Sequence, residues 1–347
     1  MSTTSRSLDI TKHSVKAQLI AKTFENRIIG QPEAVSAYIN VLEKYLSGMY
    51  SRTRPLANLL FLGPTGTGKT SSAEAFAYGL FGDESKMLKV NCGEFQHSHE
   101  TAKLVGSPPG YLGHRETHPM LTNARLKDLR SEAFPFSILL FDEIEKASDA
   151  LWNLLLSILD KGSLSTGTNE QVDELRNCVI ILTSNVGSKE LASRLGGDAI
   201  GFSSGESALS AERLKEISVS AAQRKFMPEF LNRVDEIIMF NSLTEKDLEE
   251  IIELELNKIQ AQVIASASTK VNVCVSPSAK KAIVAEGYDK KYNARHLKRA
   301  IENRVALAVS CAIVTEQALD LDSVVVDHKD GEFVYSVEHN LSPRKPA

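Results

Sequence analysis

Apolar and polar positions follow two patterns along this chain, one typical of strands and one typical of helices. Short apolar runs between polar residues occur at 58–62, 87–90, 137–141, 178–182 and 237–240. Such runs are typical of strands that are buried on both faces of a sheet. Between them, apolar residues recur at helical spacing, as in Ala73, Phe76, Ala77 and Leu80. This alternation predicts an α/β fold with a five-stranded parallel sheet between helices.

After residue 241 the pattern predicts a smaller α+β domain. Ser242 and Glu245 have the spacing of a capping box. One apolar stripe then predicts a long helix: Leu248, Ile252, Leu256, Ile259 and Val263. The next predicted elements are a strand at 271–275 and a helix from Ser278. They are followed by a third helix and by strands near Val324 and Val334. The apolar residues of the third helix are Leu297, Ile301, Val305 and Ala308. We expect a tail at 1–20, a large domain at 21–241, a small lid domain at 242–339 and a second tail at 340–347.

Composition narrows the class of protein. The 347 residues are 42% hydrophobic and 24% charged, which excludes collagen-like and wholly disordered chains. No apolar run approaches the roughly 20 residues that span a bilayer, and the polar N-terminus does not resemble a secretory signal. The four cysteines form no C-x-x-C pair, and the net charge is −4. A cytoplasmic protein without a membrane or nucleic-acid partner is expected.

One phosphate-binding motif follows the first predicted strand. Residues 63–70 match G-x-x-x-x-G-K-[ST] and precede an amphipathic helix. Glycines let backbone N–H groups surround a triphosphate at a helix N-terminus, so ATP is the expected ligand. Lys69 is expected on the phosphates and Thr70 on Mg²⁺. The nucleotide-binding residues predicted here are Gly63, Pro64, Thr65, Gly66, Thr67, Gly68, Lys69 and Thr70.

Two carboxylates, Asp142 and Glu143, end the strand at 137–141. In a parallel sheet, this position lies beside the phosphate loop. Asp142 suits Mg²⁺, and Glu143 suits the base that deprotonates the attacking water. A solvated strand end is the alternative interpretation of the same pair.

Several motifs together resemble the AAA+ ATPases, and within them the second nucleotide-binding module of the Clp unfoldase/disaggregase group. The similar stretches are 28–35, 63–70, 106–113, 140–147, 181–187, 228–235, 287–289 and 293–295. They occur in the family's order. The resemblance implies an AAA+ large domain followed by a small lid domain.

The resemblance also implies roles for three further polar residues. Asn185 corresponds to sensor 1, which polarises the attacking water or contacts the γ-phosphate, and a simple turn residue is its alternative. Arg233 corresponds to the arginine finger that reaches the neighbouring subunit's nucleotide, with an ion pair to Asp235 or Glu236 as the alternative. Arg295 corresponds to sensor 2 on the lid, although Asn293 and His296 stand where the family usually has Gly and Pro.

Three further segments correspond to binding elements of the family. Ile28 and Ile29 match the apolar strip on adenine, although ordinary core packing explains them too. Tyr111 and Leu112 lie in a Pro/Gly-rich loop that in the family lines a pore and grips polypeptide; a packed surface turn is the alternative. Ile200, Gly201 and Phe202 match the loop by which some members dock on a ClpP-like peptidase, and a hydrophobic staple is the alternative.

The leading hypothesis is therefore an ATP-driven protein unfoldase that acts as a hexameric ring on polypeptide substrates. A chaperone or disaggregase without a peptidase, and an ATP-switched remodelling module, are the alternatives. About 25 residues precede Ile28, too few for a substrate-collecting domain. Substrates are thus expected to reach the pore through an adaptor protein or directly. The segment between Gly113 and Phe136 is longer than is usual in the family, and its sequence indicates no role.

Overall fold

The computed structural model describes residue 9 and residues 12–107, 119–167, 170–187, 211–266, 269–288 and 293–339. Contacts between Cα atoms divide the chain into two units. The first consists of Met1–Pro64 and Gly68–Asn241, and the second of Thr65–Thr67 and Ser242–Ala347. Within the described ranges, no helix has both the length and the apolar character needed to cross a membrane.

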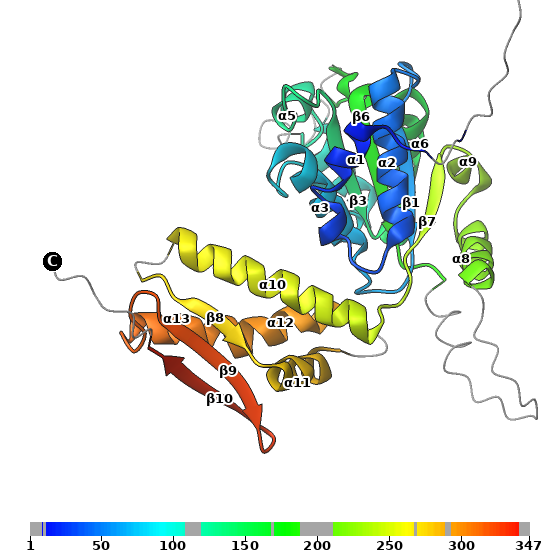
Figure 1. Cartoon of the computed structure of the whole chain (residues 1–347). Coiled ribbons are helices and arrows are strands. Elements are labelled where there is room, and N and C mark those ends of the chain that lie inside the picture. Colours follow the sequence, from blue (N-terminus) through cyan, green and yellow to red (C-terminus); the bar gives the residue numbers. More distant parts are fainter. Residues whose placement is uncertain are drawn as a thin grey trace, which may run out of the picture. The chain divides into compact units, whose positions relative to one another are not determined.

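A five-stranded sheet forms the centre of the first unit (Figure 1). Its strand order is β2-β3-β6-β1-β7, and every neighbouring pair is parallel. The strands are β1 (Ala57–Leu62), β2 (Leu88–Asn91), β3 (Ser137–Asp142), β6 (Cys178–Ser184) and β7 (Glu236–Met239). The predicted α/β fold class is confirmed, and each predicted apolar run overlaps one of these strands.

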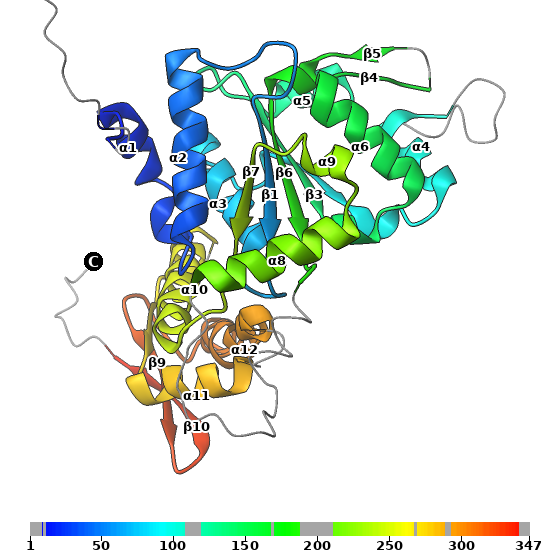
Figure 2. The ribbon, with the colours of Figure 1, turned by 90° about the vertical axis from the view of Figure 1, so that its right-hand side faces the viewer.

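Helices cover both faces of this sheet, as Figure 2 shows. The α-helices of the first unit are α1 (Val15–Ala21), α2 (Pro32–Ser47), α3 (Lys69–Phe81), α4 (Ala102–Val105), α5 (Asn123–Asp128), α6 (Asp149–Lys161), α8 (Ala211–Lys225) and α9 (Pro228–Leu231). Short 3₁₀ turns are η1 (Glu25–Arg27), η2 (Cys92–Glu94), η3 (Ser98–Thr101), η4 (Ile144–Lys146) and η5 (Glu174–Asn177). A two-stranded hairpin of β4 (Leu164–Ser165) and β5 (Gln171–Val172) was not expected from the sequence.

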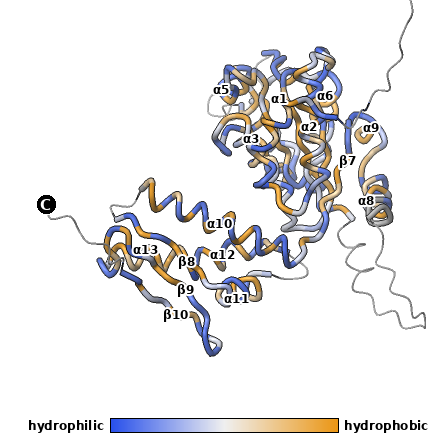
Figure 3. Tube along the Cα trace, viewed as in Figure 1, coloured by the Kyte–Doolittle hydropathy of each residue, from blue (hydrophilic) through white to orange (hydrophobic). Residues whose placement is uncertain are grey.

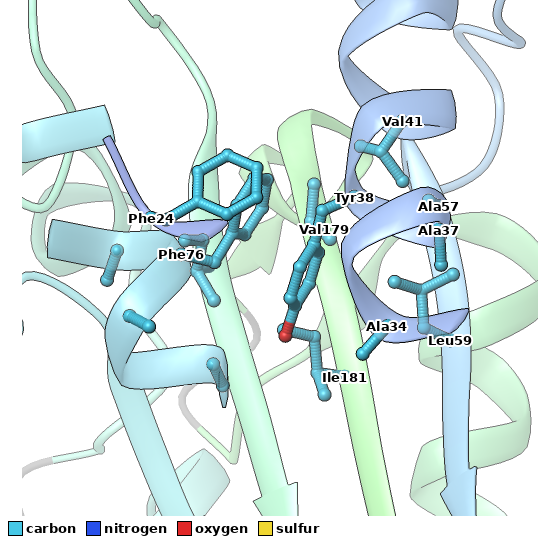
Figure 4. Packing of buried hydrophobic residues seen from close by; sticks show 14 of the residues in the cluster. Phe24, Ala34, Ala37, Tyr38, Val41, Ala57, Leu59, Phe76, Val179 and Ile181 are labelled. Atoms are coloured by element: carbon cyan, nitrogen blue, oxygen red, sulfur yellow. The ribbon is translucent and has the colours of Figure 1, made fainter. Parts of the chain in front are cut away.

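Alternate residues of the central strands belong to two different apolar clusters. Leu59 packs with residues of α2 and α3, whereas Leu60 packs with residues of α6, α8 and α9. In the first cluster, the ring of Tyr38 stacks on that of Phe76 with centroids 4.1 Å apart (Figure 4). Because helices bury both faces, the strands are apolar at nearly every position rather than at every second one.

The unusually long segment before Phe136 contains α5 in its described part, from Pro119 onward. The Thr122 hydroxyl caps α5 by accepting a hydrogen bond from the Arg125 backbone N–H at 3.2 Å. Leu126 of α5 is fully buried in the cluster on the α6 face. This part of the segment thus extends the core of the first unit.

The second unit contains a three-stranded sheet and a helical layer (Figure 1). Its elements are α10 (Glu245–Ser266), β8 (Asn272–Val275), α11 (Pro277–Gly287), η6 (Ala294–His296), α12 (Leu297–Ile301), η7 (Glu302–Ala306), α13 (Leu307–Val314), β9 (Ser323–Lys329) and β10 (Glu332–Glu338). The central strand β9 pairs parallel with β8 and antiparallel with β10. Hydrophobic and hydrophilic residues alternate along α10, as expected of a helix with one buried face (Figure 3).

The capping box predicted at Ser242 and Glu245 is wrong by two positions. The box is formed by Thr244 and Asp247, whose side chains each bond the other's backbone N–H, at 3.2 and 2.8 Å. Leu243 and Leu248, on either side of Thr244, are both buried in the same core. This pair forms a hydrophobic staple that selects Thr244 as the cap.

The third predicted helix of this unit changes its winding in the middle. Between α12 and α13, Glu302–Ala306 forms a π-helical turn. After Val305, the next buried position is Val309 and not the predicted Ala308. A π turn contains more residues than an α turn, so it moves the buried stripe along by one residue.

Candidate functional site

The loop between β1 and α3 has a positive φ at each of its three glycines, Gly63, Gly66 and Gly68. Gly63 has a φ of 149°, and a Cβ atom there would lie 2.4 Å from the Phe240 carbonyl oxygen. Gly68, which precedes the first residue of α3, has a φ of 93°. Side chains at these positions would strain the loop, so the glycines of the motif are needed for its shape. The loop leads into the N-terminus of α3, where the helix dipole favours anions.

Lys69, the first residue of α3, points its ammonium group back into this loop. Nζ donates to the carbonyl oxygens of Gly63 at 2.7 Å and Pro64 at 2.8 Å, and to Oδ1 of Asn185 at 2.8 Å. Burial lowers the pKa of Lys69 to about 8, while the charges of nearby carboxylates oppose this shift. These three acceptors are uncharged oxygens, so the hydrogen bonds do not neutralise the ammonium charge. A phosphate group is a suitable counter-ion for such a cation.

Thr70 and Asp142 meet next to Lys69. The Thr70 hydroxyl lies 3.0 Å from each carboxylate oxygen of Asp142. A hydroxyl and a carboxylate are hard oxygen donors of the kind that Mg²⁺ takes, together with phosphate oxygens and water. The residues present therefore fit a magnesium ion that arrives with a nucleotide. The Thr183 hydroxyl, which the sequence did not single out, donates to Asp142 Oδ1 at 2.5 Å.

Glu143 follows β3 in a left-handed conformation, with φ 59° and ψ 50°. Its backbone N–H donates to the Thr183 hydroxyl at 3.0 Å, which links the end of β3 to β6. Its carboxylate pairs with the Lys146 ammonium at 2.6 Å. Non-glycine residues rarely adopt this conformation, and such strain is concentrated at functional sites.

Asn185 follows β6 and joins the phosphate loop to the carboxylates. Its side-chain oxygen accepts from Lys69, and its amide nitrogen lies 3.2 Å from Glu145 and 3.5 Å from Glu143. The structure thus brings Lys69, Asp142, Glu143 and Asn185 together, as the sequence predicted for the phosphate site. It adds Glu145, which the sequence did not single out although its carboxylate stands two positions after Glu143.

The two isoleucines predicted beside adenine differ in burial. Ile28 is 7% exposed and belongs to the core cluster that packs against α2 and α3. Ile29 is half-buried. Core packing is sufficient to account for Ile28, and contact of either residue with adenine stays a prediction.

Arg233 follows α9 and does not pair with the acidic residues that the sequence suggested. Its guanidinium lies 3.8 Å from Asp160, and Asp235 instead pairs with Arg54. The side chain is 29% exposed, and its Nε is buried without a partner among the described residues. The alternative ion pair with Asp235 or Glu236 is therefore not formed among the described residues, and the finger role stays a prediction.

Arg295 lies in the second unit, on the 3₁₀ turn η6, and is exposed. The preceding Asn293 has φ 48° and ψ −132°, a backbone conformation that favours glycine. The turn thus has a glycine-like backbone although the residue is Asn. The predicted contact of Arg295 with nucleotide stays a prediction.

Two predicted segments lie outside the described residues. They are the loop with Tyr111 and Leu112, and the tripeptide Ile200, Gly201 and Phe202. Their roles stay predictions from the sequence.

Sequence comparison assigns a family to each unit. Residues 54–237 match the AAA domain (Cdc48 subfamily), and residues 243–326 match the C-terminal D2-small domain of ClpB protein. The first match covers the phosphate loop, both carboxylates and Asn185. The second covers most of the described second unit.

Similar proteins and structures agree with these matches. The chain is 37% identical over 332 residues to "ATP-dependent Clp protease ATP-binding subunit ClpC" of Staphylococcus aureus, covering 96% of this chain and 39% of that protein. The ClpC subunit of Staphylococcus epidermidis is 38% identical over 315 residues, or 91% of this chain and 37% of that protein.

Two solved Hsp104 structures were also found. One, with ATPγS and FITC casein, has a TM-score of 0.75 and 30% identity, over 93% of this chain and 52% of that one. The Saccharomyces cerevisiae Hsp104:casein complex has a TM-score of 0.77 and 28% identity, over 94% and 53%. The chain spans about two fifths of the curated relatives' length and about half of the Hsp104 chains. It belongs to the AAA family of ATPases, as a Clp-type AAA+ module with a small domain of the ClpB D2 type.

Proposed function

We propose that this chain is an ATP-driven protein unfoldase or translocase, which uses Mg²⁺-dependent ATP hydrolysis to pull on polypeptides. The observation that carries the proposal is a cluster of four residues: Asp142, Glu143 and Asn185 at the ends of the neighbouring strands β3 and β6, and Lys69 at the start of α3. Phosphoryl transfer to water requires a cation for the phosphates, two oxygen ligands for the metal ion, a carboxylate base and an amide.

Each residue of the cluster has a distinct task in this proposal. Lys69 binds the β- and γ-phosphates, and Thr70 and Asp142 hold Mg²⁺, which supplies charge neutralisation at the phosphates. Glu143 accepts the proton of the attacking water. Asn185 orients that water or contacts the γ-phosphate. Contact of Ile28 and Ile29 with adenine, and of Arg295 with the nucleotide, are further parts of this proposal.

A hexameric ring is the proposed active assembly, because Arg233 would act on the nucleotide of a neighbouring subunit. Among the described residues, its partly exposed guanidinium has the Glu229 carbonyl oxygen and, at 3.8 Å, the Asp160 carboxylate as partners. A guanidinium remains charged at any pH of interest and suits the spread charge of the transition state.

Polypeptides are the proposed substrates, gripped by Tyr111 and Leu112 in a central pore. Two observations support this class of substrate: both similar Hsp104 structures contain casein, a protein, and the net charge of −4 does not favour nucleic acid. An adaptor protein is the proposed route by which substrates reach the ring.

The Tyr111→Ala variant tests the proposed grip on polypeptide. We expect the ATPase rate to stay within about threefold of wild type. Unfolding of a tagged fluorescent protein should fall at least about tenfold, because the loop loses the aromatic ring that is proposed to grip the polypeptide. Loss of fluorescence under excess ATP measures unfolding, and Tyr111→Phe, which keeps the ring, is the matched control. Equal unfolding by Tyr111→Ala and wild type would contradict pore threading.

A ClpP-like peptidase is the proposed partner of the ring, through Ile200 and Phe202. The relatives' description as an ATP-binding subunit of a Clp protease supports this partner. Two apolar side chains separated by a single glycine would suit an apolar pocket on a second ring.

Deletion of residues 200–202 tests the peptidase partner. The full-length chain with ATP should co-elute with a ClpP-type ring, and the deletion should lose co-elution while keeping its ATPase rate. Deletion of three residues from the C-terminal end, 345–347, is the control for shortening the chain. Co-elution by neither chain would favour a chaperone or disaggregase, or an ATP-switched remodelling module.

A further inference from the structure

Glu145 makes two hydrogen bonds to Asn185. Its Oε1 accepts from the Asn185 backbone N–H at 3.3 Å and from the side-chain amide at 3.2 Å. Glu145 lies on the turn η4 after β3, and Asn185 lies after β6, the strand beside β3. One carboxylate oxygen thus ties two neighbouring strand ends together at the phosphate site.

The chemistry of the neighbours determines which way the Asn185 amide faces. The Lys69 ammonium can only donate, so it must meet the amide oxygen, at 2.8 Å. An ionised carboxylate can only accept, so Glu145 must meet the amide nitrogen. If the amide were reversed, its nitrogen would face the Lys69 ammonium, so that two donors would meet. Its oxygen would face the Glu145 carboxylate, so that two acceptors would meet.

We propose that Glu145 is a positioning residue that holds the Asn185 side chain in the orientation required for ATP hydrolysis, an inference that rests on the proposed function. Glu145 itself is not expected to touch the nucleotide or the attacking water. Its effect passes through Asn185, whose amide nitrogen also lies 3.5 Å from the base Glu143. A catalytic donor is effective only when it is fixed before the reaction begins.

The second carboxylate oxygen of Glu145 offsets part of the stability that the two hydrogen bonds to Oε1 supply. Oε2 is buried and has no hydrogen-bond partner among the described residues. Burial of a charged oxygen without a partner destabilises the folded state. Replacing that oxygen should therefore not lower the melting temperature, whereas a merely structural residue would lower it on substitution.

Glu145 also acts on Lys69 through its charge, and this second role can be separated from positioning. Its negative charge is the largest of the charge effects that raise the pKa of Lys69. Glu145→Gln keeps the length of the side chain and an acceptor oxygen but removes the charge. Glu145→Asp keeps the charge but shortens the side chain by one methylene, or about 1.5 Å. If Glu145 acts by positioning Asn185, Glu145→Gln should be more active than Glu145→Asp. If it acts through its charge, Glu145→Asp should be the more active variant.

The test compares both variants with wild type in steady-state ATP hydrolysis by the full chain. We expect Glu145→Asp to lower kcat about 30-fold or more, because an error of about 1 Å at a reacting group can cost 100-fold. Glu145→Gln should retain kcat within about fivefold, since its oxygen still reaches Asn185. KM for ATP should change less than about threefold in both, and neither melting temperature should fall in parallel with kcat. Glu84→Asp and Glu84→Gln, at an exposed carboxylate, are matched controls.

A double-mutant cycle then tests whether Glu145 acts through Asn185. Adding Glu145→Asp to Asn185→Ala should lower kcat no further than Asn185→Ala alone. Additive losses, or the reverse order with Gln less active than Asp, would overturn the inference. An inactive wild-type chain would contradict the proposed function itself, whereas an active wild type with an equally active Glu145→Asp variant would contradict only the positioning role.

Discussion

The Glu143→Gln variant should bind ATP with nearly wild-type affinity and hydrolyse it at least about 100-fold more slowly, since removal of a general base costs 10²–10⁴ in rate. Gln has the same length as Glu and can still accept a hydrogen bond from Lys146, now 2.6 Å from the carboxylate. It cannot take a proton from water at neutral pH. The contacts of Lys69 and Thr70 do not involve Glu143, so the phosphate-binding part of the site should be unchanged.

Two measurements on this variant separate binding from chemistry. Phosphate release gives the rate of hydrolysis, and titration with a fluorescent ATP analogue gives the affinity. If the ring threads polypeptide, the ATP-bound variant should also hold a protein substrate stably enough for co-purification. Glu84→Gln, which changes an exposed carboxylate in the same way, is the control. Hydrolysis by Glu143→Gln within threefold of wild type would show that another group accepts the proton.

Lys69→Ala should instead weaken ATP binding at least about tenfold, with hydrolysis lost as well. Hydrogen bonds to charged groups contribute about 1.5–3 kcal/mol each, so losing even one phosphate contact weakens binding about 10- to 150-fold. The substitution leaves Gly63, Pro64 and Asn185 without the shared donor that they have in this structure. We therefore expect both a weaker site and a less ordered loop.

The comparison with a second lysine makes this prediction specific. Lys127→Ala, on the exposed surface of α5 where the side chain pairs with Glu174, removes the same charge from the chain. It should leave affinity for the fluorescent analogue unchanged. Thermal melting with and without ATP gives an independent readout, because only chains that bind ATP are stabilised by it. Stabilisation of Lys69→Ala by ATP equal to that of wild type would contradict the assigned role.

Local patterns predicted most of the secondary structure, and one of the two errors has a local cause. Ser242 and Thr244 both satisfy the capping-box spacing, and burial of Leu243 with Leu248 decides in favour of Thr244. This staple is itself a sequence pattern, because Leu243 and Leu248 stand at the N′ and N4 positions relative to Thr244. The shift from Ala308 to Val309 was not visible, because a π turn depends on how the whole helix packs.

The sequence by itself determined the phosphate loop, the carboxylate pair after β3 and the α/β order of elements. These features depend on residues that are close in the chain, where spacing and local chemistry are sufficient for prediction. Only the tertiary structure decided that Thr183 bridges Asp142 and the backbone of Glu143, and that Glu145 holds Asn185. These contacts join segments about 40 residues apart, and the register of β3 against β6 sets them. Register between distant parallel strands depends on the packing of the whole sheet, and no short sequence pattern specifies it.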